Sequence, residues 1–214
     1  MIPASRARLS PADKFDVRRN ELAETALLTL GELGYARTSL RDIASNSPFS
    51  HGVLHYYFAD KLELVSYSIS YYKLRCVTRY DEVVERSTTA EELLDGFAAK
   101  LAETIVDEAP MHRLWYDLRI ESMFDERLRE TVLGIDTALR AMVWRIVTRY
   151  SELAGRELAM DPAATYNVLD GLFQAGLLGH VSGDPVALPR MVDQVHALLP
   201  LVLGQPLLVG ATSL

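Results

Sequence analysis

The chain has 214 residues, of which 49% are hydrophobic and 24% charged, and its formal net charge is −7. Such a chain can bury a substantial core and has the composition of a globular protein rather than a disordered one. A single cysteine excludes an intrachain disulfide and a cysteine-based metal site. Because no run of 18 apolar residues occurs, no membrane span is expected, and we expect a soluble cytoplasmic protein.

The charge is unevenly distributed along the chain. Residues 1–62 carry 8 Lys/Arg and 7 Asp/Glu, a net charge of +1, whereas residues 63–214 have a net charge of −8. A near-neutral N-terminal part followed by an acidic remainder permits a local DNA-binding surface.

Helix signals begin close to the N-terminus. Ser10 followed by Pro11 is typical of a helix start, and Gly34 is typical of a helix end. Ser39, Ser50 and Asp60 are also typical of helix starts, and they predict two short helices followed by a longer one. The first four helices are therefore expected at about residues 10–33, 39–45, 50–58 and 60–79.

The rest of the chain also follows helical spacing. Apolar residues three and four apart continue to the C-terminal region, and no segment alternates with period two, so no sheet is expected. We predict an all-α fold of about nine helices, with a three-helix head (1–62) on a larger helical body (63–214) and a loose tail from Gly204. The helices of the body are expected at about residues 89–108, 110–124, 125–153, 161–181 and 185–203.

Two short helices joined by a tight break and held against a longer helix are typical of a helix-turn-helix unit. In such a unit the second short helix enters the major groove. Leu54 and Phe58 are expected to face the core, and Tyr57 is left open between core and DNA contact. Arg6 and Arg8 are read either as a minor-groove arm or as a solvated tail. The expected DNA contacts are Ser39, Arg41, Ser50, His51, Gly52, Val53, His55, Tyr56 and Lys61.

The segments GYARTSLRDIA and SHGVLHYYFADKLELV resemble the N-terminal signature of the tetracycline-repressor (TetR) family of bacterial transcription regulators. Two residues depart from the family pattern: Pro48 stands where Gly is usual in the turn, and His55 stands where Tyr usually contacts a phosphate. The resemblance covers roughly residues 18–65 and implies a homodimer that a small-molecule effector releases from a palindromic operator. The matching positions are Gly34-Tyr35, Thr38-Ser39, Ile43-Ala44, Ser50, Gly52, Leu54, Tyr57-Phe58, Lys61 and Leu64.

Candidate effector contacts lie in the body. Trp115, Arg119 and Met123 are four residues apart on one expected helix. They form either the wall of a ligand pocket or a core from which the arginine extends to solvent. A buried Arg119 would favour an anionic or carbonyl-bearing effector. His112 shows no metal-ligand spacing and is expected at the surface or at a cap. Further candidates for ligand contact are Tyr67, Tyr71, Phe97, Trp144 and Phe173.

A dimer interface is expected on the last two helices. Gly171, Ala175 and Gly179 recur every four residues, a stripe that lets another helix approach closely. The alternative is that the stripe packs within its own subunit. The other residues assigned to this interface are Leu172, Val192, Val195 and Leu199.

No nucleophile elbow, Gly-rich phosphate loop, HExxH sequence or paired cysteines occur. We therefore expect that the protein is not an enzyme and binds no cofactor. The expected function is a ligand-responsive DNA-binding transcriptional regulator that acts as a repressor, with double-stranded DNA and a small molecule as partners and no membrane. The alternative, which Pro48 favours, is an all-α protein that sequesters a small molecule and has a non-functional DNA-binding head.

Overall fold

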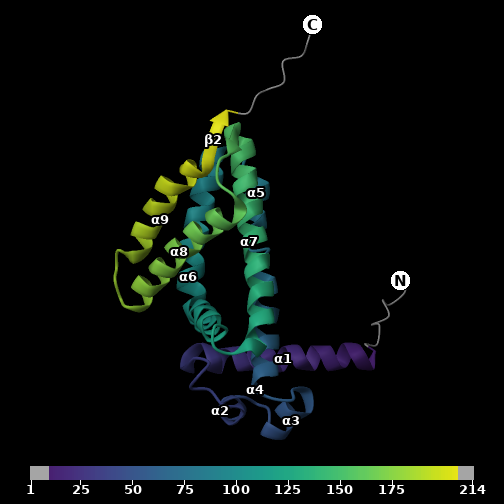
Figure 1. Cartoon of the computed structure of the whole chain (residues 1–214). Helices are drawn as coiled ribbons and strands as arrows, with labels where there is room; N and C mark the ends of the chain where they lie inside the picture. The colour runs from purple at the N-terminus through teal and green to yellow at the C-terminus, as the bar shows by residue number, and fades with distance from the viewer. Residues whose placement is uncertain (1–9, 207–214) are drawn as a thin grey trace, which may run out of the picture. The chain divides into compact units, whose positions relative to one another are not determined.

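The computed structural model describes residues 10–206. Helices make up most of this part of the chain (Figure 1), which confirms the expected all-α class. The helices are α1 (Pro11–Leu33), α2 (Leu40–Ser45), α3 (His51–Tyr57), α4 (Lys61–Cys76), α5 (Asp81–Arg86), α6 (Ala90–Glu121), α7 (Glu126–Ala154), α8 (Pro162–Val181) and α9 (Ala187–Leu198). The arm residues Arg6 and Arg8 lie outside the described residues.

Capping boxes begin α1 and α2, as their sequences predict. The Ser10 hydroxyl accepts a hydrogen bond from the Asp13 N–H at 3.1 Å, and the Asp13 carboxylate accepts one from the Ser10 N–H at 2.9 Å. Ser39 and Asp42 form the same reciprocal pair at the start of α2. Hydrogen bonds from the serines hold the pKa of both aspartates below the ordinary value, because they favour the charged carboxylate.

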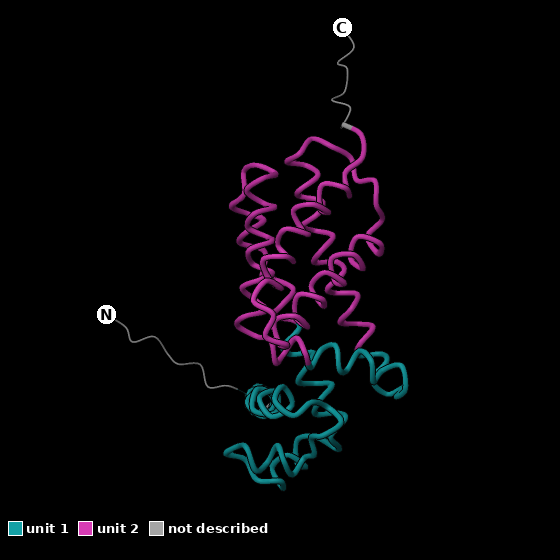
Figure 2. The backbone as a smooth tube through the Cα atoms, turned by 90° about the vertical axis from the view of Figure 1, so that its left-hand side faces the viewer, with its two compact units in different colours: residues 1–73, 114–131 teal, residues 74–113, 132–214 magenta. Residues whose placement is uncertain are grey.

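The chain divides into two compact units (Figure 2). The first comprises Met1–Lys73 and Leu114–Thr131, and the second comprises Leu74–Arg113 and Val132–Leu214. The first unit therefore contains α1 to α3, most of α4, the C-terminal end of α6 and the first residues of α7. This division follows packing and is not a test of function, so the expected functional domains 1–62 and 63–214 stay a prediction.

The core of the first unit lies where α1 to α4 meet. Leu54 and Phe58, on and just after α3, are each 1% exposed, which confirms that they face inward. Their burial attaches the short α3 to the longer helices, since a helix of seven residues is not stable alone. The other buried apolar side chains of this core are Leu22, Ala26, Leu30, Ile43, Leu64 and Val65.

In the second unit the helices differ from expectation at two places. The helices expected at 89–108 and 110–124 form one helix, α6, with a kink at Glu108 (φ −134°, ψ 27°) just before Pro110. The proline accounts for the kink because its ring clashes with the carbonyl four residues earlier. The six-residue α5 was not expected, and it has no fully buried residue whose spacing could have predicted it.

A two-stranded antiparallel ribbon corrects the expectation of no strand. Strand β1 (Arg156–Leu158) pairs with β2 (Leu203–Pro206). The expected final helix ends instead at Leu198 and passes through a 3₁₀ turn, Leu199–Val202, before β2. Pro200 cannot donate an α-helical hydrogen bond, which explains the early end. Within the described part of the chain, no helix is both long and apolar enough to span a bilayer.

Candidate functional site

The turn between α2 and α3 is closed by a serine rather than by a glycine. The Ser47 hydroxyl accepts a hydrogen bond from the Phe49 N–H at 3.1 Å, and it lies 3.3 Å from the Ala44 carbonyl oxygen. No described residue other than glycine has a positive φ, so the turn accommodates Pro48 in a backbone conformation that proline favours.

The N-terminal part of α3 presents an exposed polar face. Ser50 caps the helix by accepting a hydrogen bond from the Val53 N–H at 3.3 Å. His51, Gly52 and His55 are exposed, and Val53 is half-buried. The imidazole rings of His51 and His55 meet edge to face, with centroids 4.5 Å apart. Because the His51 and His55 side chains lie outside the core, this face of α3 is available to a binding partner.

The four residues of HYYF (55–58) separate into surface and core. Phe58 is buried, and Tyr56 is 73% exposed. Tyr57, left open by the sequence, packs on Phe15 of α1 with ring centroids 4.7 Å apart. The structure thus gives Tyr57 a packing role and leaves Tyr56 beside His55 on the exposed side of α3.

The remaining predicted DNA contacts differ in exposure. Ser39 and Arg41, at the start of α2, are exposed. Lys61, the first residue of α4, is half-buried and donates a hydrogen bond to the Tyr35 carbonyl oxygen at 2.5 Å. Its ammonium lies 4.0 Å from the centroid of the Tyr35 ring. Burial lowers the pKa of Lys61, and the negative charges of Asp117 and Glu121 oppose that effect.

Sequence reasoning missed Asp117. Its carboxylate accepts a hydrogen bond from the Tyr35 N–H at 2.7 Å. A Cβ atom at Gly34 would lie 3.2 Å from the same carboxylate oxygen, and Gly34 has φ +83°, which disfavours other residues there. Asp117 on α6 and Lys61 on α4 therefore both hold the loop between α1 and α2. The Gly34-Tyr35 pair was visible in the sequence, but its partner is 82 residues away.

The candidate effector contacts fall into three groups by exposure. Trp115 and Phe97 are buried, whereas Met123 is 70% exposed and lies beyond the end of α6. The hydroxyls of Tyr67 and Tyr71 donate hydrogen bonds to α1 residues, so both tyrosines connect α4 to α1. Ligand contact by any of these residues stays a prediction. The half-buried candidates are Tyr67, Tyr71, Arg119, Trp144 and Phe173.

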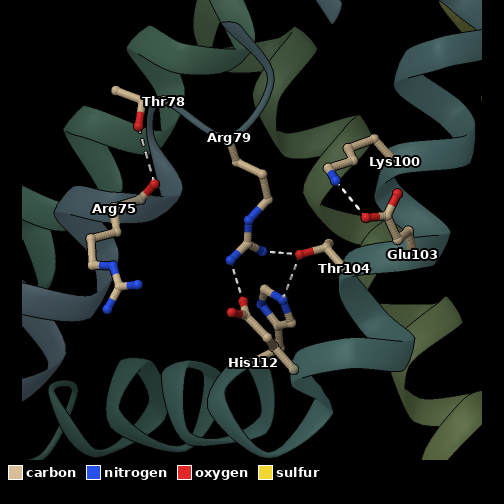
Figure 3. Close-up of polar contacts among 8 residues, drawn as sticks. Arg75, Thr78, Arg79, Lys100, Glu103, Thr104 and His112 are labelled. Atoms are coloured by element: carbon tan, nitrogen blue, oxygen red, sulfur yellow. Dashed lines mark hydrogen bonds and ion pairs between the residues drawn. The ribbon is translucent and has the colours of Figure 1, made fainter. Parts of the chain in front are cut away.

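A polar cluster lies inside the second unit at the kink of α6 (Figure 3). The Arg79 guanidinium donates to the Thr104 hydroxyl and pairs with the Glu108 carboxylate. His112 Nε2 lies 3.5 Å from the Thr104 hydroxyl oxygen. Thr104 and His112 are 4% and 5% exposed, so the expectation that His112 lies at the surface was wrong. The His112 ring meets Phe173 edge to face, with centroids 4.9 Å apart. The cluster joins the two sides of the kink through buried polar contacts.

The expected dimer stripe on α8 is divided between two environments. Gly171 and Ala175 are exposed, and nothing lies within 4 Å of a Cβ atom built on Gly171. A Cβ atom on Gly179 would lie 2.5 Å from the Ala187 Cβ of α9, so Gly179 packs within its own chain. Val195 and Leu199 are fully buried, whereas Leu172 and Val192 are half-buried. The exposed part of α8 is therefore the surface still open to a second copy.

The turn, the buried inner side of α3 and its exposed outer side together define a helix-turn-helix DNA-binding protein. Residues 22–67 match the family model described as bacterial regulatory proteins, tetR family. The head is thus a TetR-type DNA-binding domain, and the chain is a DNA-binding transcriptional regulator.

Known proteins resemble the chain well beyond this head. The HTH-type transcriptional regulator BetI of Burkholderia lata is 25% identical over 192 residues, which cover 88% of this chain and 95% of that protein. A TetR transcription regulator from Haloarcula marismortui has a TM-score of 0.72 at 17% identity, over 88% of this chain and 100% of that one. A transcriptional regulator from Saccharomonospora viridis in complex with choline has a TM-score of 0.72 at 16% identity, over 88% and 98%. The two structural likenesses show the shared fold.

Proposed function

We propose that this chain is a repressor that binds a palindromic operator as a homodimer and leaves it when a small-molecule effector binds. The observation that carries the proposal is the exposed N-terminal face of α3, whose polar side chains take no part in the core while Leu54 and Phe58 anchor the opposite side. A regulator that binds DNA must share a compartment with the chromosome, so we place the protein in the cytoplasm. We assign it no catalytic role.

We assign base reading to the start of α3 and phosphate contacts to its surroundings. His51 and Val53 would meet base edges in the major groove, and the missing side chain at Gly52 would let the helix approach closely. A Cβ atom on Gly52 would meet only the Ser50 hydroxyl, at 3.9 Å, so the space above it is open. Phosphate contacts would come from Ser39, Arg41, His55, Tyr56 and Lys61.

We assign the effector to the body, near the buried end of α6. Trp115 supports this assignment because it is a large, buried aromatic residue two positions from Asp117, which holds the loop before α2. An effector that binds the DNA-free state about 1–3 kcal/mol more tightly would change operator occupancy roughly 5- to 150-fold. The required differential affinity is therefore modest.

Selection from randomised double-stranded DNA with the purified full chain tests the proposal. We expect a palindrome whose half-sites are centred one helical turn apart, about 34 Å. His51→Ala and Val53→Ala should change which bases are selected. Lys61→Ala should weaken all sequences alike and lower the slope of log affinity against log salt by about one unit.

The salt slope also separates two roles for Lys61. If Lys61→Ala lowers stability and leaves the salt slope unchanged, the lysine serves only to hold Tyr35. Failure to enrich any sequence would favour the alternative function, a small-molecule-sequestering protein whose head does not bind DNA.

A further inference from the structure

An aromatic contact fixes the N-terminal half of α1 against α3. Phe15 of α1 packs on Tyr57 with ring centroids 4.7 Å apart, and it meets Tyr56 edge to face at 6.4 Å. Both helices belong to the first compact unit, drawn in teal in Figure 2. Aromatic pairs of this kind stabilise a contact beyond the area that they bury. This part of α1 therefore has a fixed position beside the helix that we assign to the major groove.

Arg18 lies one turn further along α1 and reaches the turn between α2 and α3. Its guanidinium carbon is 5.3 Å from the centroid of the Phe49 ring, over which it lies. Phe49 directly precedes Ser50, the N-cap of α3, and the Phe49 N–H donates to the Ser47 hydroxyl. A guanidinium over an aromatic face keeps the N–H groups at its edge free for hydrogen bonds. Arg18 thus places a positive charge next to the N-terminal end of α3.

The pairing of Arg18 with Glu21 is easily exchanged for another. Arg18 Nη1 donates a hydrogen bond to Glu21 Oε2 at 2.6 Å. The two side chains are 47% and 48% exposed, and an exposed pair three residues apart on a helix contributes little stability. Because arginine carries several N–H donors in a planar fork, a phosphate can accept two parallel hydrogen bonds from it. Arg18 is therefore suited to bind an anion that approaches α3.

We propose that Arg18 contacts a DNA phosphate in the operator complex, a contact that α1 supplies from outside the helix-turn-helix unit. This inference rests on the proposed DNA-binding function and adds a residue to the DNA-binding surface. Arg18 precedes residues 22–67, so it lies outside the segment that matches the family model. The phosphate is one that flanks the bases read by the start of α3, since Phe49 and the N-cap of α3 are neighbours in the chain.

Binding of the full-length protein to two fluorescein-labelled duplexes tests the proposal. One is the palindrome selected by the wild-type protein, and the other has a random sequence of the same length. Arg18→Ala should weaken binding to both about tenfold per subunit and lower the slope of log affinity against log salt by about one unit per subunit. The preferred bases should not change, because a phosphate contact carries no sequence information. Arg18→Lys should keep the salt slope and weaken binding less than Arg18→Ala does.

Three further variants separate a phosphate contact from a role in folding. Arg86→Ala is the matched control, because Arg86 is an exposed arginine paired with Glu82 on its own helix in the second unit, and it should bind like the wild type. Glu21→Gln removes the competing carboxylate and should raise affinity roughly twofold to fivefold. Phe49→Leu should weaken binding in the wild type but change little in the Arg18→Ala background. Circular dichroism confirms that each variant is folded.

Neutralised DNA linkages identify the phosphate itself. A methylphosphonate linkage keeps the DNA backbone and removes the negative charge of one phosphate. When this linkage is moved stepwise through the selected palindrome, one pair of symmetry-related positions should weaken binding of the wild-type protein and leave binding of Arg18→Ala unchanged. An arginine that only stabilises the fold would show no such dependence on a particular linkage.

Several results would overturn the inference. These are an unchanged affinity and salt slope in Arg18→Ala, an equal effect of Arg86→Ala, or the absence of any linkage whose neutralisation matters less in Arg18→Ala. A changed base preference in Arg18→Ala would make the arginine a base contact and reject the phosphate contact. If the wild-type protein bound neither duplex, the proposed function itself would fail. If the wild-type protein binds both and Arg18→Ala binds equally well, only the role of Arg18 is rejected.

Discussion

Asp117 of α6 holds Tyr35 of the head through a hydrogen bond of 2.7 Å from the Tyr35 N–H to the carboxylate. The Tyr35 carbonyl oxygen accepts a second bond from Lys61 of α4. Both backbone polar groups of one loop residue are thereby fixed by side chains of α4 and α6. The α1–α2 loop precedes the helix-turn-helix directly, so its position bears on that of α2.

Asp117→Ala should therefore destabilise the protein. A part-buried, charge-assisted hydrogen bond is lost and the Tyr35 N–H is left without its partner, which predicts a fall of about 1–3 kcal/mol in the free energy of unfolding. Urea denaturation measures this change. Asp107→Ala, at an exposed aspartate on the same helix, should change stability by less than about 0.5 kcal/mol. Equal effects of the two variants would contradict the role assigned to Asp117.

The sequence predicted the head in detail because its signals are local. Ser10, Ser39 and Ser50 each cap the helix that they were expected to begin, and Phe58 is buried as expected. These features depend on residues within one turn of each other. Local patterns therefore sufficed for the position and orientation of α3.

The contacts that sequence reasoning missed join distant segments. Asp117 meets Tyr35 across 82 positions, and Lys73 meets Trp115 from a different helix. Neither pair has a characteristic spacing, since helix packing alone brings them together. The ribbon of β1 and β2 was missed for a related reason: its three- and four-residue strands are too short to show alternation.

The capping aspartates predict loss of stability in acid. The pKa of Asp13 and of Asp42 is lowered in the folded protein by serine hydrogen bonds. A depressed pKa means that the folded state favours the ionised carboxylate. The stabilisation is therefore present above the ordinary aspartate pKa, about 3.9, and is lost as the pH falls through the lower folded value. Asp42→Asn should flatten part of this dependence in urea melts from pH 6 to pH 3. The exposed Asp16→Asn is the control, and an identical slope in both variants would contradict the assignment to Asp42.

His55 predicts a pH dependence of operator binding. If the imidazole lies against a phosphate, the protonated ring binds better than the neutral one, so affinity should rise as the pH is lowered. Fluorescence anisotropy with a selected operator at constant ionic strength measures this rise. His55→Tyr should reduce it, because tyrosine is uncharged across this range. The His51 ring lies 4.5 Å away, centroid to centroid, so His51→Ala is measured in parallel to separate the contribution of His51 from that of His55. A flat profile in the wild type would place His55 away from the phosphate.

Pro48 offers a test of whether the turn is competent for DNA binding. The Ser47 hydroxyl closes the turn, and no described residue other than glycine has a positive φ. Replacing Pro48 by glycine therefore relieves no backbone strain. The variant should lose about 0.4–1 kcal/mol of stability through greater freedom of the unfolded chain. The operator affinity of the variant should stay within about twofold of the wild-type affinity. A tenfold change would require a difference of about 1.4 kcal/mol in binding free energy. A large gain in affinity for Pro48→Gly would instead show that the natural turn impairs DNA binding.

The dimer proposal needs a probe that leaves the fold of one chain intact. Gly179→Trp is unsuitable because even a Cβ atom there meets Ala187 of α9. Gly171 is exposed, and nothing lies within 4 Å of its Cβ position, so Gly171→Trp should fold normally and obstruct only a partner that approaches this side of α8.

We therefore expect multi-angle light scattering to show a monomer for Gly171→Trp, with weaker binding to a full palindrome and unchanged binding to a half-site. Gly134 of α7 is equally exposed and equally free of neighbours, so Gly134→Trp is the matched control and should remain a dimer. Leu178, 65% exposed one helical turn after Ala175 on α8, gives a second test. Leu178→Glu should weaken the dimer by placing a charge in an apolar interface. If Gly171→Trp and Leu178→Glu both stay dimeric while Gly134→Trp does not, the interface lies on α7 instead of α8.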